Sequence, residues 1–346
     1  MQSPKQEKLQ QNLLSELRRR PFALAPMAGI TDHAFRSFMK KNGAGIVVTE
    51  LVSATGLEYK SKKTQALMSF DEDQRPVGIQ LFGDNPEHLA HAAKLVEEVG
   101  ADFVDLNFGC PVPKVVKKGA GSAMMKDLPA MKKVLQSVVR AVEIPVTIKI
   151  RTGWDQSSRN ALDVCRLALD EGVTWVAIHG RTRAQGYSGL ADWDFIGDIK
   201  AKTQIPVIGN GDIHTGHQAV SRLKDYGCDG VMIGRGCLKN PLIFQEAQNL
   251  LEKNNIHVEK DYVRLFSGLK QELVSRCDDH ITQIQLKKFA AWFASGFPGA
   301  AQFRKNIFQS KTTDEILLTA NNFFETVKIS HQEDTSGEGF LLGGHG

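Results

Sequence analysis

Short apolar runs that alternate with helix-length segments constrain the fold of this chain more than any other feature. Eight runs rich in β-branched residues predict strands at residues 22–25, 46–49, 77–81, 103–106, 146–150, 175–178, 207–209 and 230–233. Amphipathic segments between them predict helices, which include residues 86–99, 129–142, 159–170 and 215–226. Several of the strands are apolar throughout, which is typical of a parallel sheet covered on both faces. The alternation therefore predicts a closed TIM-type (β/α)8 barrel of the α/β class.

An open, doubly wound parallel sheet is the main alternative to this barrel. Such a sheet usually has fewer strands and carries a glycine-rich, phosphate-binding turn after the first of them. Here the first predicted strand leads into residues 26–29 (PMAG), which lack that pattern. The closed barrel is therefore favoured.

The regions outside the barrel have a different character. Residues 1–20 are polar apart from a small leucine cluster and predict a short helical extension, followed by the barrel over residues 21–250. Beyond residue 250 the strand pattern stops, and residues 251–329 predict a small all-α domain. Residues 330–346 are polar and glycine-rich, which is typical of a disordered tail. The length of 346 residues fits a barrel of about 250 residues with one smaller unit.

Composition narrows the class of protein further. No apolar run approaches the roughly 18–20 residues of a membrane span, and the N-terminus lacks the apolar core of a secretory signal. The five cysteines are scattered, without the spacing of a metal site. These features predict a reduced, cytoplasmic protein with no membrane or metal partner, and a monomer is expected. The net charge of +4 permits a nucleic-acid partner without requiring one.

Reactive groups in such a barrel lie where its strands end, at the C-terminal face. The fourth predicted strand leads to Cys110, in a loop stiffened by glycine and proline. A cysteine placed there can act as a nucleophile or a proton donor. A small, buried apolar residue is the alternative. Core packing is expected for the other cysteines, which are Cys165, Cys228, Cys237 and Cys277.

The ends of other strands carry groups that suit an anionic ligand. Lys149 closes an otherwise apolar strand, where a buried ammonium needs an anionic partner and the alternative is a lysine that reaches solvent at the rim. His179 ends the next strand, where a hydrogen-bonded core histidine is the favoured interpretation if this residue is taken alone. Glycine-rich loops follow the last two strands, where barrels recurrently bind phosphate, and Arg235 adds a positive charge there.

An apolar shelf and an amide complete this set. The shelf comes from Pro26, Met27 and Ala28 after the first strand, and the amide is that of Gln80 in the third. Flavin mononucleotide (FMN) is phosphorylated, planar and anionic when reduced, so it fits these groups, and Lys149 would stabilise charge on its N1/C2=O edge. The residue types alone do not separate FMN from another phosphorylated ligand.

Five barrel motifs closely resemble those of the tRNA-dihydrouridine synthases, in particular the bacterial B-type branch. They are residues 25–32 (APMAGITD), 80–83 (QLFG), 105–111 (DLNFGCP), 179–182 (HGRT) and 210–212 (NGD). They occur in order across the whole barrel. The resemblance implies that the chain reduces the C5=C6 bond of specific uridines in tRNA, with NADPH reducing a bound FMN. It implies hydride transfer to C6 and a proton from Cys110, as general acid, to C5.

The resemblance also assigns roles to individual residues. Asn107 and Arg181 are expected near the substrate base. Residues 287–304 resemble the family's RNA-binding segment, which places Lys288 and Arg304 on the RNA. That segment often reads Arg-Lys-His followed by Trp-Tyr, and Lys287, Phe289 and Phe293 depart from it. The implied FMN contacts are Pro26, Met27, Ala28, Gln80, Lys149, His179, Asn210, Gly211, Asp212, Gly234 and Arg235.

Two other functions compete with this interpretation. A flavin barrel acting on a small metabolite would share the lysine and the phosphate loops, but it would not need a basic, aromatic helical domain. A non-catalytic RNA-binding module would lack the cofactor residues, which are present.

Overall fold

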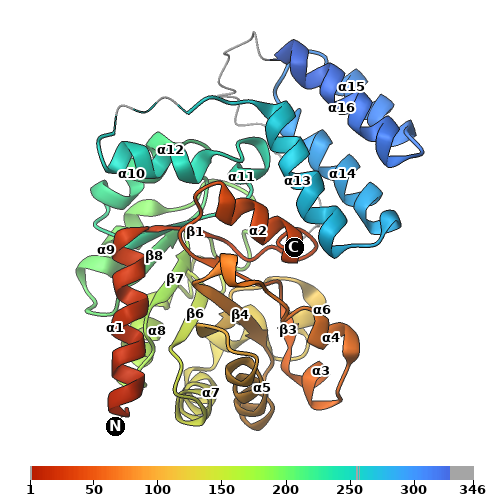
Figure 1. The fold of residues 1–346 in the computed structure, drawn as a ribbon. Helices are drawn as coiled ribbons and strands as arrows, with labels where there is room; N and C mark the ends of the chain where they lie inside the picture. The colour runs from red at the N-terminus through yellow and green to blue at the C-terminus, as the bar shows by residue number, and fades with distance from the viewer. Residues whose placement is uncertain (1, 255, 257, 328–346) are drawn as a thin grey trace.

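The computed structural model, which describes residues 2–254, 256 and 258–327, contains a closed parallel barrel (Figure 1). Its strands are hydrogen-bonded in the order β1-β9-β8-β7-β6-β5-β4-β2, and a bridge between Ala23 and Ile46 closes the ring. They are β1 Phe22–Leu24, β2 Val47–Val48, β4 Val77–Phe82, β5 Phe103–Phe108, β6 Val146–Arg151, β7 Val176–His179, β8 Val207–Asn210 and β9 Gly230–Ile233. The predicted barrel is confirmed, and each predicted strand is present.

The strands differ from the prediction in two respects. A short additional strand, β3 (Val52–Ser53), pairs with β4 and was not predicted, because two residues carry no readable periodicity. Strands also run further toward their C-terminal ends than the apolar pattern indicates, to Arg151 in β6, His179 in β7 and Asn210 in β8. The backbone ladder continues into these polar residues, so their side chains stand on rigid strands.

Helices connect the strands as expected. They are α2 His33–Lys41, α3 Ala54–Glu58, α4 Lys62–Ala66, α5 Pro86–Glu98, α6 Pro113–Val116, α7 Leu128–Ala141, α8 Ala161–Asp170, α9 Trp193–Ala201, α10 Gly216–Asp225, α11 Gly236–Lys239 and α12 Ile243–Leu251, with short 3-10 helices η1 Glu72–Gln74 and η2 Gly121–Lys126. Gly100 and Gly172 end α5 and α8 with φ of +79° and +80°, a backbone conformation that glycine adopts without strain.

The interior of the barrel is filled with apolar side chains and closed at the N-terminal end. Phe103, Trp175 and Met232 belong to one interior cluster, to which the N-terminal helix α1 (Pro4–Arg19) adds Leu13 and Leu17. The predicted N-terminal helix is therefore confirmed, and Figure 1 shows it along the edge of the barrel. Because α1 covers this end, the C-terminal end is where a ligand can enter.

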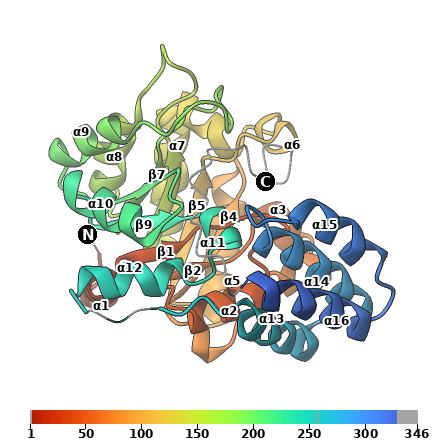
Figure 2. The ribbon, with the colours of Figure 1, turned by 90° about the horizontal axis from the view of Figure 1, so that it is seen from above.

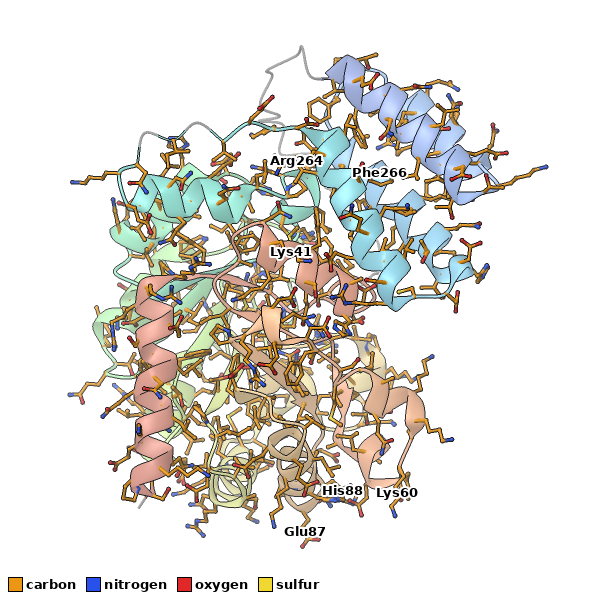
Figure 3. All side chains as sticks on the ribbon, in the orientation of Figure 1. Lys41, Lys60, Glu87, His88, Arg264 and Phe266 are labelled. Carbon is orange, nitrogen blue, oxygen red and sulfur yellow. The ribbon has the colours of Figure 1, made fainter. Side chains whose placement is uncertain are left out.

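A bundle of helices follows the barrel, as predicted. It comprises α13 Tyr262–Arg276, α14 Asp279–Phe293, α15 Ala300–Gln309 and α16 Thr313–Val327, and it lies beside α2 in Figures 1 and 2. Phe35 of α2 stacks on Phe289 of α14 with ring centroids 4.6 Å apart. Lys41 of α2, labelled in Figure 3, pairs with Glu272 of α13. We propose that the domain boundary lies between α12 and α13; residues 328–329 and the predicted tail at 330–346 are outside the described residues.

Candidate active site

A cavity opens at the C-terminal end of the barrel, among the ends of β1, β6, β7, β8 and β9. Its wall contains the predicted cofactor residues Pro26, Met27, Lys149, His179, Asn210, Gly211, Asp212, Gly234 and Arg235. Arg181, expected near the substrate base, also lines it. Ala28 and Gln80 were predicted to contact the cofactor but are not part of this wall.

Lys149 projects from β6 into the cavity as a largely buried cation. Its Nζ donates a hydrogen bond to the Asn210 side-chain oxygen at 3.1 Å, and the Asn210 amide in turn donates to the Met232 carbonyl at 2.7 Å. Burial lowers the pKa of Lys149 to about 8, and the neighbouring Arg151 lowers it further while Asp105 opposes the shift. A bound anion would relieve this cost, so the side chain is poised for one.

The burial of Lys149 is expected to lower the free energy of unfolding of the ligand-free protein in a way that depends on pH. With a pKa of about 8 in the fold against 10.5 for an ordinary lysine, the ammonium penalises folding fully below pH 8, and the penalty disappears as pH rises toward 10.5. Lys149→Met is therefore expected to stabilise the ligand-free protein at pH 7 by about 1–3 kcal/mol, after the lost Asn210 hydrogen bond is subtracted. Urea unfolding of both proteins across this pH range measures the difference, and a destabilised variant at pH 7 would contradict it.

Arg181 and Asp212 form a buried ion pair at the cavity wall. The guanidinium donates to both carboxylate oxygens at 2.9 Å, and the backbone N–H of Ala191 donates to the same carboxylate at 2.7 Å. His179 lies beside Arg181, with 3.4 Å between its Nε2 and the guanidinium. Burial, reinforced by the surrounding cations, holds the pKa of His179 far below its ordinary value. The imidazole is thus neutral and can hydrogen-bond a ligand without adding charge.

The loop that carries Cys110 is held in place by buried hydrogen bonds. The Asn107 side-chain oxygen accepts from the backbone N–H of Cys110 at 2.8 Å and of Gly109 at 3.2 Å. Ser122 donates from its backbone N–H and its hydroxyl to the Cys110 carbonyl, at 3.0 and 2.9 Å. Cys110 packs in a cluster with apolar neighbours, including Val115, and the residue is 8% exposed. The loop is therefore preorganised, with its thiol in an apolar setting.

Cys110 is not part of the cavity wall, but the cations Arg151 and Lys149 influence its thiol. Burial raises the pKa of Cys110 above its ordinary value, while Arg151 and Lys149 are close enough to lower it in part. The thiol therefore remains protonated at neutral pH. A protonated thiol is suited to donating a proton rather than to attacking as a thiolate. Of the alternatives left open by the sequence, the proton donor fits this environment better than the nucleophile.

Gln80 supports the Cys110 loop from below the cavity. Its side-chain N–H donates to Asp105 at 2.6 Å, and its oxygen accepts from the amide of Asn107 at 2.9 Å. Thr147 donates to the other oxygen of Asp105, also at 2.6 Å. This buried chain of contacts orients Asn107, which holds Cys110. The sequence analysis did not name Asp105 as a site residue. The signal that could have identified it is a carboxylate within a largely apolar strand.

Tyr187 is a second residue that the sequence analysis missed. It lines the cavity, and its ring centroid lies 4.7 Å from the Arg235 guanidinium and 5.6 Å from that of Arg151. Arg151 itself is buried and donates to the carbonyls of Gly109 at 2.8 Å and Gly186 at 2.7 Å. It thereby joins the Cys110 loop to the loop of Tyr187. An aromatic residue between two glycines, at 186 and 189, was the available signal.

The residues around the cavity fit a phosphorylated ligand. Lys149 and Arg235 bring positive charge to the wall, whereas Asp212 is already paired with Arg181. Gly234 leaves room: a Cβ there would meet only Ala25 and Met27, at ordinary contact distances of 3.7 Å. A side chain at this position would stand where a ligand can lie. The donor set and the space together suit a phosphate-bearing group.

The residues expected to contact RNA differ in their surroundings. Arg304 is exposed on α15 and available to a partner. Lys288 is half-buried, and its Nζ donates to the Gly29 carbonyl at 2.7 Å. Phe293 and Phe303, which the sequence suggested as part of a basic, aromatic arm, are buried in the bundle core, and Phe308 is exposed. Most of these aromatic residues therefore stabilise the bundle.

Two further features of the described part of the chain concern metal and membrane partners. Within it, no cluster of three or more His, Cys, Asp or Glu side chains could hold a metal ion. Its helices are all too short or too polar to cross a bilayer.

A parallel barrel with a cation-lined cavity at its C-terminal face is typical of a TIM-barrel enzyme. A family model described as dihydrouridine synthase (Dus) matches residues 23–329. The chain belongs to the dihydrouridine synthase family, as its motifs predicted, and the predicted oxidoreductase class is confirmed with it.

Similar proteins span most of the chain. tRNA-dihydrouridine synthase B of Pseudomonas aeruginosa is 36% identical over 312 residues, which cover 87% of this chain and 92% of that protein. A probable tRNA-dihydrouridine synthase of Rickettsia prowazekii is 39% identical over 290 residues, covering 81% and 87%. Among solved structures, histamine dehydrogenase from Rhizobium sp. 4-9 is 14% identical with a TM-score of 0.49, over 73% of this chain and 49% of that one. The barrel assignment rests on strand pairing, not on this likeness.

Proposed function

We propose that this protein reduces uridines in tRNA to dihydrouridine, with FMN as bound cofactor and NADPH as the source of electrons. The observation that carries the proposal is the Cys110 thiol, preorganised and within electrostatic reach of the cation-lined cavity. Membership of the dihydrouridine synthase family supports the reaction. The tRNA substrate is supported by the names of relatives that match over most of this chain.

FMN is the cofactor that fits the residues of the cavity. Arg235 and the space above Gly234 would hold its phosphate, and Lys149 would face the part of the ring that becomes anionic. When bound, FMN would supply two-electron hydride chemistry between NADPH and C6 of a uracil ring. His179 and Asn210 would orient the ring by hydrogen bonds. The Arg181–Asp212 pair would keep the loop after β8 in place.

The chain's own contribution to the chemistry is a proton. Reduction of the C5=C6 bond requires C5 to gain a proton, and the Cys110 sulfur would donate it as general acid. Burial keeps the pKa of this thiol raised, so the proton is present at neutral pH. Asn107 and Ser122 hold the loop so that the thiol need not be repositioned for each turnover. The base itself must leave its stack to reach the barrel mouth.

Electrostatic attraction would hold the RNA outside the cavity. Arg304 and Lys305 are exposed on α15, and Lys114, Lys117 and Lys118 are exposed beside the Cys110 loop. We expect tRNA affinity to fall by about 100-fold between 50 and 200 mM salt if about four phosphates are contacted. Filter binding at several salt concentrations measures this slope, and Arg304→Ala should reduce it by about one unit. An affinity insensitive to salt would count against a phosphate-binding surface.

Substrate-dependent NADPH oxidation tests the proposed function. The FMN-loaded protein is mixed with unmodified tRNA, and free uridine and orotate, which both carry the C5=C6 bond, serve as comparison substrates. We expect turnover with tRNA and background rates with the small molecules. Comparable turnover of a small substrate would instead favour a flavin barrel acting on a metabolite.

A further inference from the structure

A hydrogen bond to Gly29 connects the helical bundle to the face of the barrel that carries the cavity. Gly29 lies in the loop after β1, between the cavity-lining Met27 and helix α2. Its carbonyl accepts a hydrogen bond from Nζ of Lys288, on α14, at 2.7 Å. Its N–H donates to the carboxylate of Glu50, which follows β2 in the barrel. Both polar groups of Gly29 are therefore held, one by the bundle and one by the barrel.

A second contact from the same helix holds the other end of this segment. Gln285 of α14 donates to a carboxylate oxygen of Asp32 at 3.1 Å. The other oxygen of Asp32 accepts from the N–H of Phe35 at 2.8 Å and caps α2. Gln285 and Lys288 are three residues apart and so share one face of α14. That face therefore fastens the loop at both residue 29 and residue 32.

The fastened segment is rigidly connected to the cavity wall. The Met27 N–H donates to the hydroxyl of Thr31 at 2.9 Å. The N–H groups of Ile30 and Thr31 donate back to the Met27 carbonyl at 3.0 and 2.9 Å. These bonds close a tight turn, so a displacement at Gly29 is passed to Met27.

We propose that Lys288 is a positioning residue, which sets the β1 loop and through it the cofactor wall at Met27, rather than a contact to RNA phosphate. The inference rests on the proposed function in that it takes tRNA as the substrate. The contact between Lys288 and Gly29 itself is observed in the protein without a ligand. The inference reassigns the RNA-binding role that the motif resemblance gave to Lys288. It also makes the bundle part of the cofactor site as well as a surface for RNA.

Two adjacent lysines on α14 allow a matched test with FMN-loaded protein. For Lys288→Ala we expect an about 10-fold weaker FMN dissociation constant by fluorescence, and a kcat on tRNA lower by about 10-fold. The KM for tRNA should stay within about twofold, and hydrogen exchange in residues 26–32 should accelerate. Lys288→Arg should restore both properties, since a guanidinium can donate to the same carbonyl. Lys287→Ala should show the opposite pattern, with weaker tRNA binding and unchanged FMN affinity.

The opposite result for Lys288 overturns the inference. Loss of tRNA affinity and a reduced salt slope, with FMN affinity and kcat intact, would make Lys288 a phosphate contact. Failure of Lys288→Arg to restore FMN affinity would equally contradict a hydrogen bond to Gly29 as the cause. If the wild-type protein binds FMN but does not reduce tRNA, the proposed function fails, whereas the FMN measurements still decide the role of Lys288.

Discussion

Replacing Cys110 with alanine is expected to lower kcat for tRNA reduction by about 100- to 10,000-fold, the usual contribution of a general acid. The variant should retain FMN and tRNA affinity, because the hydrogen bonds that shape the loop come from the backbone of residue 110 and from Asn107 and Ser122. Single-turnover reduction of tRNA by pre-reduced protein isolates this step from reaction with NADPH.

Cys165→Ala is the matched control for that loss. Cys165 is fully buried on α8, and burial alone raises the pKa of its thiol to about 12, whereas the cations Arg151 and Lys149 also act on Cys110. Its removal should leave kcat within about twofold, since it changes only core packing. Full activity in Cys110→Ala, or an equal loss in Cys165→Ala, would refute the role of Cys110 as proton donor.

A leucine at Gly234 is expected to eliminate FMN binding and therefore all activity. Gly234 lines the cavity, and its Cβ position has only ordinary contacts, so the larger side chain would fit the fold and enter the ligand's space. The variant should purify colourless and remain folded, with a melting temperature close to that of wild-type protein freed of FMN. The ratio of the flavin absorbance to the protein concentration gives the fraction of protein molecules that carry FMN.

Gly236 provides the contrast, because there the glycine is required by the fold. A Cβ at Gly236 would lie 2.0 Å from the carbonyl oxygen of Ile213, so Gly236→Ala must push two loops apart. We expect that variant to lose about 1–3 kcal/mol of stability even without ligand. Retention of FMN by Gly234→Leu would show that the phosphate-bearing cofactor lies elsewhere.

The barrel was predictable because its strands are short apolar runs in strict alternation with amphipathic helices. Candidate site residues such as Lys149 and Arg235 could be predicted for the same reason, because polar groups at strand ends must gather at one face of a barrel. The hydrogen-bond and ion-pair partners of such side chains could not be predicted from the sequence. The pairing of Arg181 with Asp212, for instance, depends on loop conformations that no periodicity encodes.

The other features that could not be predicted are contacts between residues far apart in the chain. The contact between Gly29 and Lys288 spans 259 positions, and it depends on how the bundle packs against α2. The motif in α14 predicted an RNA contact for Lys288, and it did not indicate the hydrogen bond to Gly29 on which our proposal for this residue rests. Gln80 shows the same limit: its cofactor contact stays a prediction, and no sequence pattern indicated the buried hydrogen bonds that its amide makes with Asp105 and Asn107.

The most direct test of the account is mass spectrometry of tRNA from cells that lack this protein, compared with cells given back either the wild-type chain or Cys110→Ala. We predict that dihydrouridine disappears from defined tRNA positions, that the wild-type chain restores it, and that Cys110→Ala does not. Unchanged dihydrouridine at every mapped position in the deleted cells would contradict the account.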